Sequence, residues 1–299
     1  MSAPRYVLVT PAYNEERLIR DTIESILSQT VRPVEWVIVS DGSTDRTDEI
    51  VRSYAERFSF IRLVRVAEDH PHNFKARIHA LNLGLTSLRS ADYGFVGMLD
   101  ADVSFGPDYF STLLAQLCSD PRLAIAGGIV VEPGRGAPRR LPDEDRRTVA
   151  NAAQLLRRSF YETIGELPML PHGAPDTYVE ITARMNGWEV RTFPELHVQH
   201  HRQTGSARGL IRGRFRQGRK DYSFGYLPDF EILKCIRRIS ETPFLWGSAA
   251  RFAGYCWSAL RRERPAVSKE FLDFLRNEQR LRVRRALQFS LVARADANR

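Results

Sequence analysis

The feature that most constrains the fold is an apolar run, Phe95–Leu99, that stops at two carboxylates, Asp100 and Asp102. A continuous apolar run of this length is typical of a strand buried on both faces, as in a parallel sheet. Side chains alternate along an extended strand, so both carboxylates point to the same side. Two ionised carboxylates at the end of a core strand repel each other unless a cation lies between them. The pattern therefore predicts a site for a divalent metal and a diphosphate, and the alternative is a turn that only ends the strand.

Strand-like and helix-like segments alternate through the first 131 residues. We expect strands at 5–10, 34–40, 60–66, 95–99 and 123–131, and helices at 16–28, 48–58, the second half of 70–85, and 107–118. The connections are short, which predicts an α/β fold with a mainly parallel sheet flanked by helices. Ligands bind such sheets beyond the carboxyl ends of the strands. The polar motifs PAYNEE, DGSTD and LDAD all fall at such ends.

The following segment is less regular. Residues 132–147 are rich in Gly, Pro and charge, which predicts an exposed loop, and 167–175 is irregular. Helices are expected at 150–164 and 177–186, with Gly187 as the C-cap of the second. The sequence WEVRTF then predicts a further strand.

Charge divides the chain at about residue 202. Residues 1–201 carry a net charge of −5, whereas residues 202–299 carry +13. We therefore expect a basic C-terminal region over 203–299, with helices near 230–240, 244–261 and 269–285, and an anionic partner. No signal peptide and no apolar run long enough to span a bilayer are recognisable. Three widely spaced cysteines are typical of reduced thiols, so a cytoplasmic location is expected.

The ordered motifs PAYNEE, DGSTDRT and LDAD resemble the nucleotide-binding half of family 2 glycosyltransferases of the GT-A fold. The resemblance covers about residues 5 to 202. It implies a Rossmann-like catalytic domain over 1–202, with nucleotide-sugar binding in 1–131 and the acceptor side in 132–202. It also implies that a sugar is transferred with inversion from a UDP-, GDP- or dTDP-sugar.

The resemblance implies roles for the residues of the donor pocket. Pro11, Tyr13 and Glu15 would line the pocket for the base and ribose, and Asp41 would accept a hydrogen bond from the base. Arg77, in RIHALN, matches a basic family position and would face the diphosphate or the nucleotide. A cationic side chain there neutralises the charge that grows on a diphosphate leaving group.

The resemblance also implies a metal site. Asp100 would contact ribose or metal, and Asp102 would bind Mn²⁺ or Mg²⁺ directly. A histidine at the end of the last strand often completes the metal shell in the family. Neighbouring strand residues point in opposite directions, so only one of His200 and His201 can face the metal, and we expect His200.

Inverting transfer needs a general base for the acceptor hydroxyl. In the family this base is the Asp of a Glu-Asp pair that opens the helix before a Gly-aromatic pair, here Gly187 and Trp188. The matching position is Asp176, although Pro175 replaces the Glu. A helix N-cap is the structural alternative for Asp176, and Glu180 is the alternative base.

The basic C-terminal region has two interpretations. In the first, it docks on an anionic membrane surface beside a lipid-linked or polymeric acceptor. In the second, its aromatic residues form a core and its arginines are solvated. The aromatic residues concerned are Trp246, Phe252, Tyr255 and Trp257. Arginines soon after the histidine pair could instead contact the donor phosphates, namely Arg202, Arg208 or Arg212. No nucleic acid is expected, because no recognised module is present.

These expectations together predict a metal-dependent glycosyltransferase that acts on a saccharide or lipid-linked acceptor in surface polysaccharide or glycan biosynthesis. It would work in the cytoplasm, at the inner face of the membrane if the basic region docks there. Two alternatives stay open. A sugar nucleotidyltransferase usually has a Gly-rich loop after the first strand, and PAYNEE is not one. A non-catalytic nucleotide-sugar-binding scaffold is hinted at only by Pro175.

Overall fold

The computed structural model describes residues 4–66, 74–133, 145–202, 209–240 and 243–297. The chain forms two compact units. The first contains Met1–Met169 and Pro175–Thr204, and the second contains Leu170–Ala174 and Gly205–Arg299.

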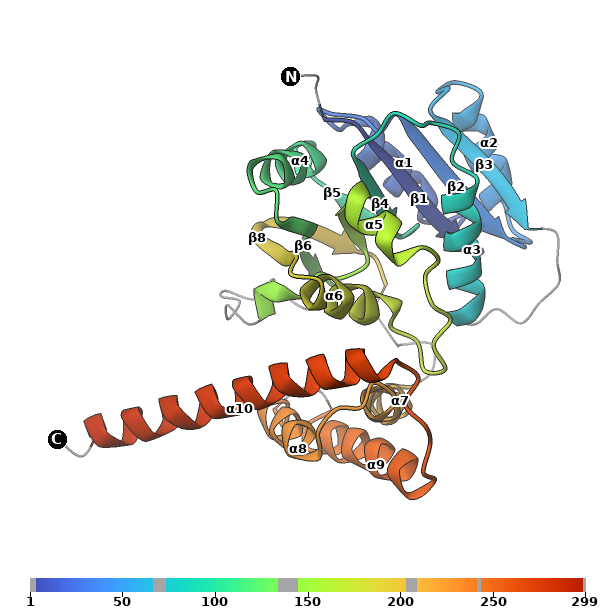
Figure 1. The fold of residues 1–299 in the computed structure, drawn as a ribbon. Helices are drawn as coiled ribbons and strands as arrows, with labels where there is room; N and C mark the ends of the chain where they lie inside the picture. The colour runs from blue at the N-terminus through green and yellow to red at the C-terminus, as the bar shows by residue number, and fades with distance from the viewer. Residues whose placement is uncertain (1–3, 67–73, 134–144, 203–208, 241–242, 298–299) are drawn as a thin grey trace. The chain divides into compact units, whose positions relative to one another are not determined.

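The first unit is a sheet covered by helices on both faces (Figure 1). Its strands are β1 (Tyr6–Ala12), β2 (Glu35–Asp41), β3 (Ile61–Val66), β4 (Phe95–Leu99), β5 (Val103–Phe105), β6 (Leu123–Val131), β7 (Ala153–Arg157) and β8 (Glu189–His200). Its helices are α1 (Ile19–Leu27), α2 (Thr47–Ala55), α3 (Phe74–Thr86), α4 (Tyr109–Ser119), α5 (Arg158–Ile164) and α6 (Pro175–Met185), with a 3₁₀ turn, η1 (Asp145–Arg147).

The eight strands lie in the order β3-β2-β1-β4-β7-β6-β8-β5. The strands β3, β2, β1 and β4 are parallel, β7 is antiparallel to both β4 and β6, and β8 is parallel to β6. The predicted α/β fold with flanking helices is confirmed, and its sheet is mixed. The parallel half brings the carboxyl ends of β1, β2 and β4 to one edge, where ligands bind in such folds.

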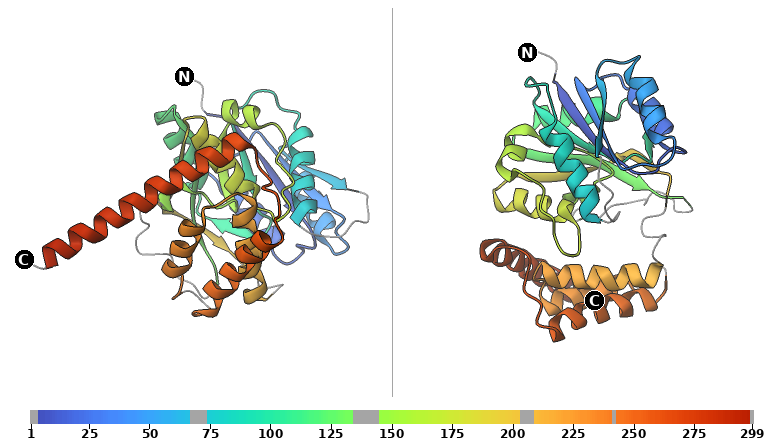
Figure 2. Two further views of the ribbon diagram at one scale, coloured as in Figure 1. Left: turned by 60° about the horizontal axis from the view of Figure 1, so that its bottom comes forward. Right: turned by 90° about the vertical axis from the view of Figure 1, so that its right-hand side faces the viewer.

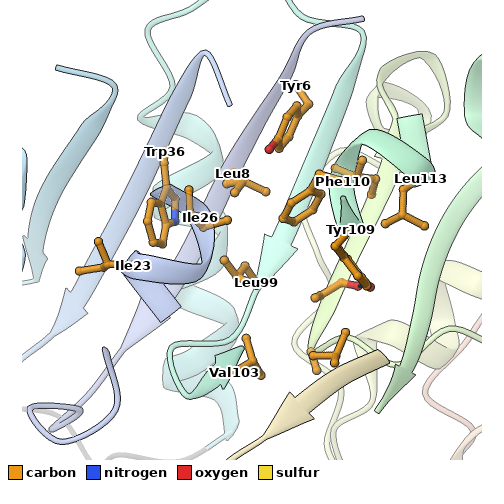
Figure 3. Packing of buried hydrophobic residues seen from close by; sticks show 14 of the residues in the cluster. Tyr6, Leu8, Ile23, Ile26, Trp36, Leu99, Val103, Tyr109, Phe110 and Leu113 are labelled. Atoms are coloured by element: carbon orange, nitrogen blue, oxygen red, sulfur yellow. Dashed lines mark hydrogen bonds between the residues drawn. The ribbon is translucent and has the colours of Figure 1, made fainter. Parts of the chain in front are cut away.

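Alternation along β1 explains why the sheet is covered on both faces. Tyr6 and Leu8 point into a core cluster with α1, α2 and α4, whereas Val7 and Val9 point into a second cluster with α3, α5 and α6. Figure 3 shows the first cluster, where Tyr6 stacks on Phe110 with ring centroids 5.0 Å apart. Both clusters hold the strand ends at which the polar motifs lie.

The prediction of a helix over residues 150–164 is wrong in its first part. Residues 153–157 form β7, and α5 begins only at Arg158. Ala, Gln and Leu favour helices in isolation, but β7 pairs with strands on both sides. Its side chains alternate between the two core clusters, with Leu155 in the first and Leu156 in the second. Burial on both faces of a central strand therefore outweighs the local propensity.

The second unit is helical. Its helices are α7 (Leu210–Ser223), α8 (Pro228–Arg237), α9 (Trp246–Leu260) and α10 (Lys269–Ala297). The sequence pattern missed α7, while the other three helices begin near the expected positions. The helices α7, α8 and α9 lie side by side in all views (Figure 2). Across the described residues, no helix combines the length and the apolar character needed to cross a membrane.

Close backbone contact joins α7 to α9. A Cβ atom at Gly218 would lie 1.8 Å from the carbonyl oxygen of Arg251, and one at Gly254 would lie 2.0 Å from that of Phe215. Only glycine permits this approach. The Arg251 side chain is buried between the two helices, where it pairs with Asp221 and donates a 2.9 Å hydrogen bond from Nε to Glu231 of α8.

Candidate active site

The loops after β1 and β2 are fastened to each other by hydrogen bonds. The backbone N–H of Asn14 donates to the Ser43 hydroxyl at 3.1 Å, and the Asn14 side-chain oxygen accepts from the Thr44 N–H at 2.9 Å. The Glu15 N–H donates to the Thr47 hydroxyl at 2.7 Å. Asn14 has a φ of 52°, which Asn tolerates better than most residues. The PAYNEE and DGSTDRT motifs therefore build one surface.

This surface contains the predicted donor-pocket residues. Pro11 is half-buried near the end of β1, next to Val39 of β2 in the strand register. Asp41 is buried at the end of β2, whereas 37% of Tyr13 is exposed. Asp41 provides a buried hydrogen-bond acceptor, and Tyr13 provides an exposed aromatic ring.

Two carboxylates and a histidine meet where β4 ends and β8 ends. The Nε2 atom of His200 lies 3.3 Å from Asp102 Oδ1 and 3.9 Å from Asp100 Oδ2. One ligand atom from each of these three residues lies within 4.8 Å of the others. Val103 of β5 pairs with His200 of β8, and this register brings the histidine beside Asp102.

The pKa values of this group show how strongly its members interact. The hydrogen bond to Asp102 raises the pKa of His200 to about 9. Burial, together with the neighbouring Asp102, raises the pKa of Asp100. The His200 shift reflects the negative charge of the carboxylates, and the Asp100 shift reflects chiefly its burial. Buried, closely spaced carboxylates are an environment that a divalent cation stabilises.

The second histidine points elsewhere. The His201 ring Nε2 lies 3.0 Å from the Ser104 hydroxyl, and its backbone N–H donates to the Asp102 carbonyl at 3.0 Å. His201 therefore supports the backbone of the carboxylate segment, and His200 alone of the pair lies beside both carboxylates.

Arg77 of α3 reaches the same group. Its guanidinium forms an ion pair with Asp100. Burial alone would lower the pKa of Arg77, but the carboxylates of Asp100, Asp176 and Asp102 outweigh burial and raise it. Asp176 is half-buried in the first turn of α6, so this helix brings a third carboxylate within electrostatic reach of Arg77.

Glu180 lies in the same helix as Asp176, but its environment differs. The Glu180 side chain is buried, and its Oε1 accepts a 2.6 Å hydrogen bond from the backbone N–H of Val149. A carboxylate that satisfies a buried N–H has a structural function. Glu180 therefore holds the backbone at Val149.

Arg202 links the donor-pocket loop to the carboxylate group. Its guanidinium pairs with Glu15, and its Nε lies 3.4 Å from Asp102 Oδ2. The sequence pattern singled out Arg202 only as a contact for donor phosphate and missed its pairing with Glu15. Of the other two arginines, Arg212 lies in the helical unit, and Arg208 is outside the described residues.

The backbone just before β7 also supports the site, and the sequence pattern did not indicate this contact. The N–H of Asp100 donates to the carbonyl of Ala152 at 2.8 Å, immediately before β7 begins. A local sequence signal for this contact does not exist, because it joins segments 52 positions apart.

Solved structures identify the fold. The mannosyltransferase PcManGT from Pyrobaculum calidifontis, in complex with GDP-Man and Mn²⁺, aligns with a TM-score of 0.58 and 23% identity, covering 95% of this chain and 81% of that one. Residues 1–349 of Staphylococcus aureus TarS, in complex with UDP-GlcNAc, align with a TM-score of 0.55 and 15% identity, covering 91% of this chain and 78% of that one. The fold is that of GT-A glycosyltransferases.

Sequence comparison then gives the family. The family model described as glycosyl transferase family 2 matches residues 7–178, and the chain belongs to this family. The uncharacterized glycosyltransferase EpsJ of Bacillus subtilis is 33% identical over 113 residues, which are 38% of this chain and 29% of EpsJ. The 4,4'-diaponeurosporenoate glycosyltransferase of S. aureus is 36% identical over 110 residues, 36% of this chain and 27% of that protein. The chain thus covers less than a third of these relatives' length.

Proposed function

We propose that the protein transfers a sugar, with inversion, from a nucleoside diphosphate sugar to a saccharide or lipid-linked acceptor in surface polysaccharide or glycan biosynthesis. The observation that carries the proposal is the grouping of Asp100, Asp102 and His200 at the strand ends, with Arg77 paired to Asp100. Asp176 lies within electrostatic reach of the same arginine. This set supplies a cation site, a fixed positive charge and a base.

The donor set fits a divalent metal. Two carboxylates and one imidazole suit Mn²⁺, and Mg²⁺ is the alternative. Asp102 and His200 would hold the ion, and Asp100 would contact ribose or the ion. A bound ion would neutralise charge on the diphosphate as it leaves. PcManGT was solved with Mn²⁺, which supports the choice of ion.

The chain's own residues account for the remaining steps. Asp176 accepts the proton of the acceptor hydroxyl as its oxygen attacks the anomeric carbon. The bond from that carbon to the diphosphate oxygen breaks on the opposite face, and the configuration is therefore inverted. Arg77 stabilises the negative charge that accumulates on the departing diphosphate.

The nucleoside would lie on the surface built by the first two loops. Pro11, Tyr13 and Glu15 would line the base and ribose pocket, and Asp41 would accept a hydrogen bond from the base. The structural neighbours bind GDP-Man and UDP-GlcNAc. The donor class in this protein is therefore a UDP-, GDP- or dTDP-sugar.

The proposed location of the protein depends on its acceptor. A lipid-linked acceptor places the enzyme in the cytoplasm at the inner face of a membrane, in peripheral contact with anionic lipid. Such contact agrees with the net charge of +13 over residues 202–299.

The test is a series of thermal melts with a panel of nucleoside diphosphates and nucleotide sugars, with and without Mn²⁺. A ligand that binds only the folded state stabilises it by about 2.7 kcal/mol at 100 times its Kd. We expect one nucleoside diphosphate class to raise the melting temperature, and to do so only with Mn²⁺. If no diphosphate raises the melting temperature in the presence of Mn²⁺, the proposal fails.

A further inference from the structure

The helix α9 carries its charge inside and its apolar side chains outside. Its only charged residue, Arg251, is 3% exposed and pairs with the buried Asp221 and Glu231. By contrast, 69% of Trp246 and 82% of Leu260 are exposed. A helix in water normally has the opposite arrangement. The outer side of α9 is therefore built to meet an apolar environment.

The aromatic residues of α9 divide between the two sides. Tyr255 is buried, and its hydroxyl donates to the carbonyl of Tyr226 at 2.6 Å. Tyr255 therefore does not face lipid, as the first interpretation of the basic region would have it, and belongs to the core of the second. Trp246, Phe252 and Trp257 are exposed. Tryptophan is enriched where proteins meet the membrane–water interface.

An apolar groove of about 270 Å³ adjoins this side of α9. Residues of α8 and of the segment after it line one wall, and residues at the start of α9 line the other. Those that point into it include Ile232, Ile236, Ile239, Leu245, Ala249 and Phe252. A dry apolar cavity of about 150 Å³ already holds a benzene-sized molecule. The groove is large enough for a segment of an alkyl chain.

Exposed arginines lie at the ends of both helices. Arg237 and Arg238 end α8, while Arg261 and Arg264 follow α9. The Arg261 guanidinium lies 4.6 Å from the centre of the Trp257 ring, so cation and aromatic side chain occupy the same surface. Arginine binds phosphate groups well, and basic residues beside apolar ones are typical of interfacial helices.

We propose that the α8–α9 face, formed by Ile236, Trp246, Phe252, Trp257 and Leu260 with the arginines at its ends, docks on an anionic lipid bilayer. The apolar side chains enter the acyl region, the groove takes part of one acyl chain, and the arginines bind the lipid phosphates. A symmetric pair of chains would cover the same face less well, because the arginines at the ends of one face would meet arginines of the second copy. This docking is independent of the proposed sugar transfer.

The experiment is sedimentation of the full-length protein with vesicles of phosphatidylcholine alone or with 30% phosphatidylglycerol. We expect binding to the anionic vesicles, at least tenfold weaker binding to the neutral ones, and loss of the difference in high salt. The double variant Trp246→Ser, Trp257→Ser should bind anionic vesicles at least tenfold more weakly. Both side chains are exposed, so its circular dichroism and melting temperature should match those of the unchanged protein.

Met169→Ser is the matched control, because this apolar side chain is half exposed in the other unit. It should bind vesicles as the unchanged protein does. The proposal is overturned if the protein binds neither vesicle, if it binds both equally, or if the double variant binds normally. A dimer that the double variant dissociates, without vesicle binding, would show that a second copy covers the face and would also overturn it.

Discussion

Asp176 is the residue on which the proposed transfer step depends most. Its half-buried carboxylate interacts with Arg77, which is paired with Asp100, so it lies beside the positive charge proposed to receive the diphosphate. Glu180, one turn later, is committed to the N–H of Val149. The same short helix thus presents one carboxylate to the site and uses the other to hold the fold.

Asp176→Asn should leave nucleotide binding unchanged while transfer falls by a factor of about 10² to 10⁴, because the amide cannot accept the proton. Transfer is measured as release of nucleoside diphosphate with a panel of saccharide and lipid-linked acceptors. Glu180→Gln is the control. It should lower the melting temperature, because Glu180 holds the Val149 N–H, and it should leave the transfer rate of the folded protein largely unchanged. If Asp176→Asn transfers sugar at the full rate while Glu180→Gln is folded and inactive, then Glu180, and not Asp176, is the base.

Glu35 shows how a single carboxylate holds a strand in place. Burial alone would raise its pKa, but hydrogen bonds from the backbone N–H groups of Ser90 and Arg89 and from the Arg62 side chain hold the pKa below 4.5. A depressed folded-state pKa means that the ionised form stabilises the fold above the pKa of the unfolded chain. That stability is lost as pH falls through the lower folded-state value.

Glu35→Gln should therefore lower the free energy of unfolding by about 1–3 kcal/mol at pH 7. The loss should shrink as the pH falls below 4.5, the ordinary value for glutamate. Urea melts at pH 7, 5 and 4 measure this. Glu49→Gln, in an exposed pair with Arg46, should change little at any pH. An equal loss for Glu35→Gln at all three pH values would contradict the role of ionisation.

At the scale of elements, the contact between α7 and α9 decides the stability of the helical unit. Gly254→Ala places a methyl group 2.0 Å from the Phe215 carbonyl oxygen and should cost about 1–3 kcal/mol by overpacking. Gly213→Ala, also in a helix but facing open space, should instead stabilise by about 0.5–1 kcal/mol. The melting temperatures of the two variants, monitored by circular dichroism, measure these effects. Equal effects of the two substitutions would show that α7 and α9 are not in close contact.

The same elements show where local sequence patterns mislead. Gly213 and Gly218 disfavour a helix over 210–223, yet Gly218 is required there by the approach of α9. Residues 153–157 have helix-favouring side chains and form a central strand because β4 and β6 lie on both sides. Both segments were mispredicted for the same reason: the element that each one packs or pairs with lies far away in the sequence.

At the scale of the whole molecule, the site residues of the motifs were predictable because each motif ends a strand. Once strands and helices alternate, the parallel order of β1, β2 and β4 brings their carboxyl ends together. The Arg202–Glu15 pair and the support of Asp100 by Ala152 were not predictable, because they join distant segments. The motifs predict which strand ends come together, and the long-range contacts show how those ends are held.

The central claim is that Asp102 and His200, beside Asp100, hold a divalent ion that receives the donor diphosphate. The most direct measurement is a Mn²⁺ titration followed by electron paramagnetic resonance, in the presence of the nucleoside diphosphate that the melts identify. We predict one tight Mn²⁺ per chain, at least tenfold weaker binding in Asp102→Asn, and normal binding in the exposed control Asp108→Asn. Equal Mn²⁺ binding by Asp102→Asn and the unchanged protein would contradict the claim.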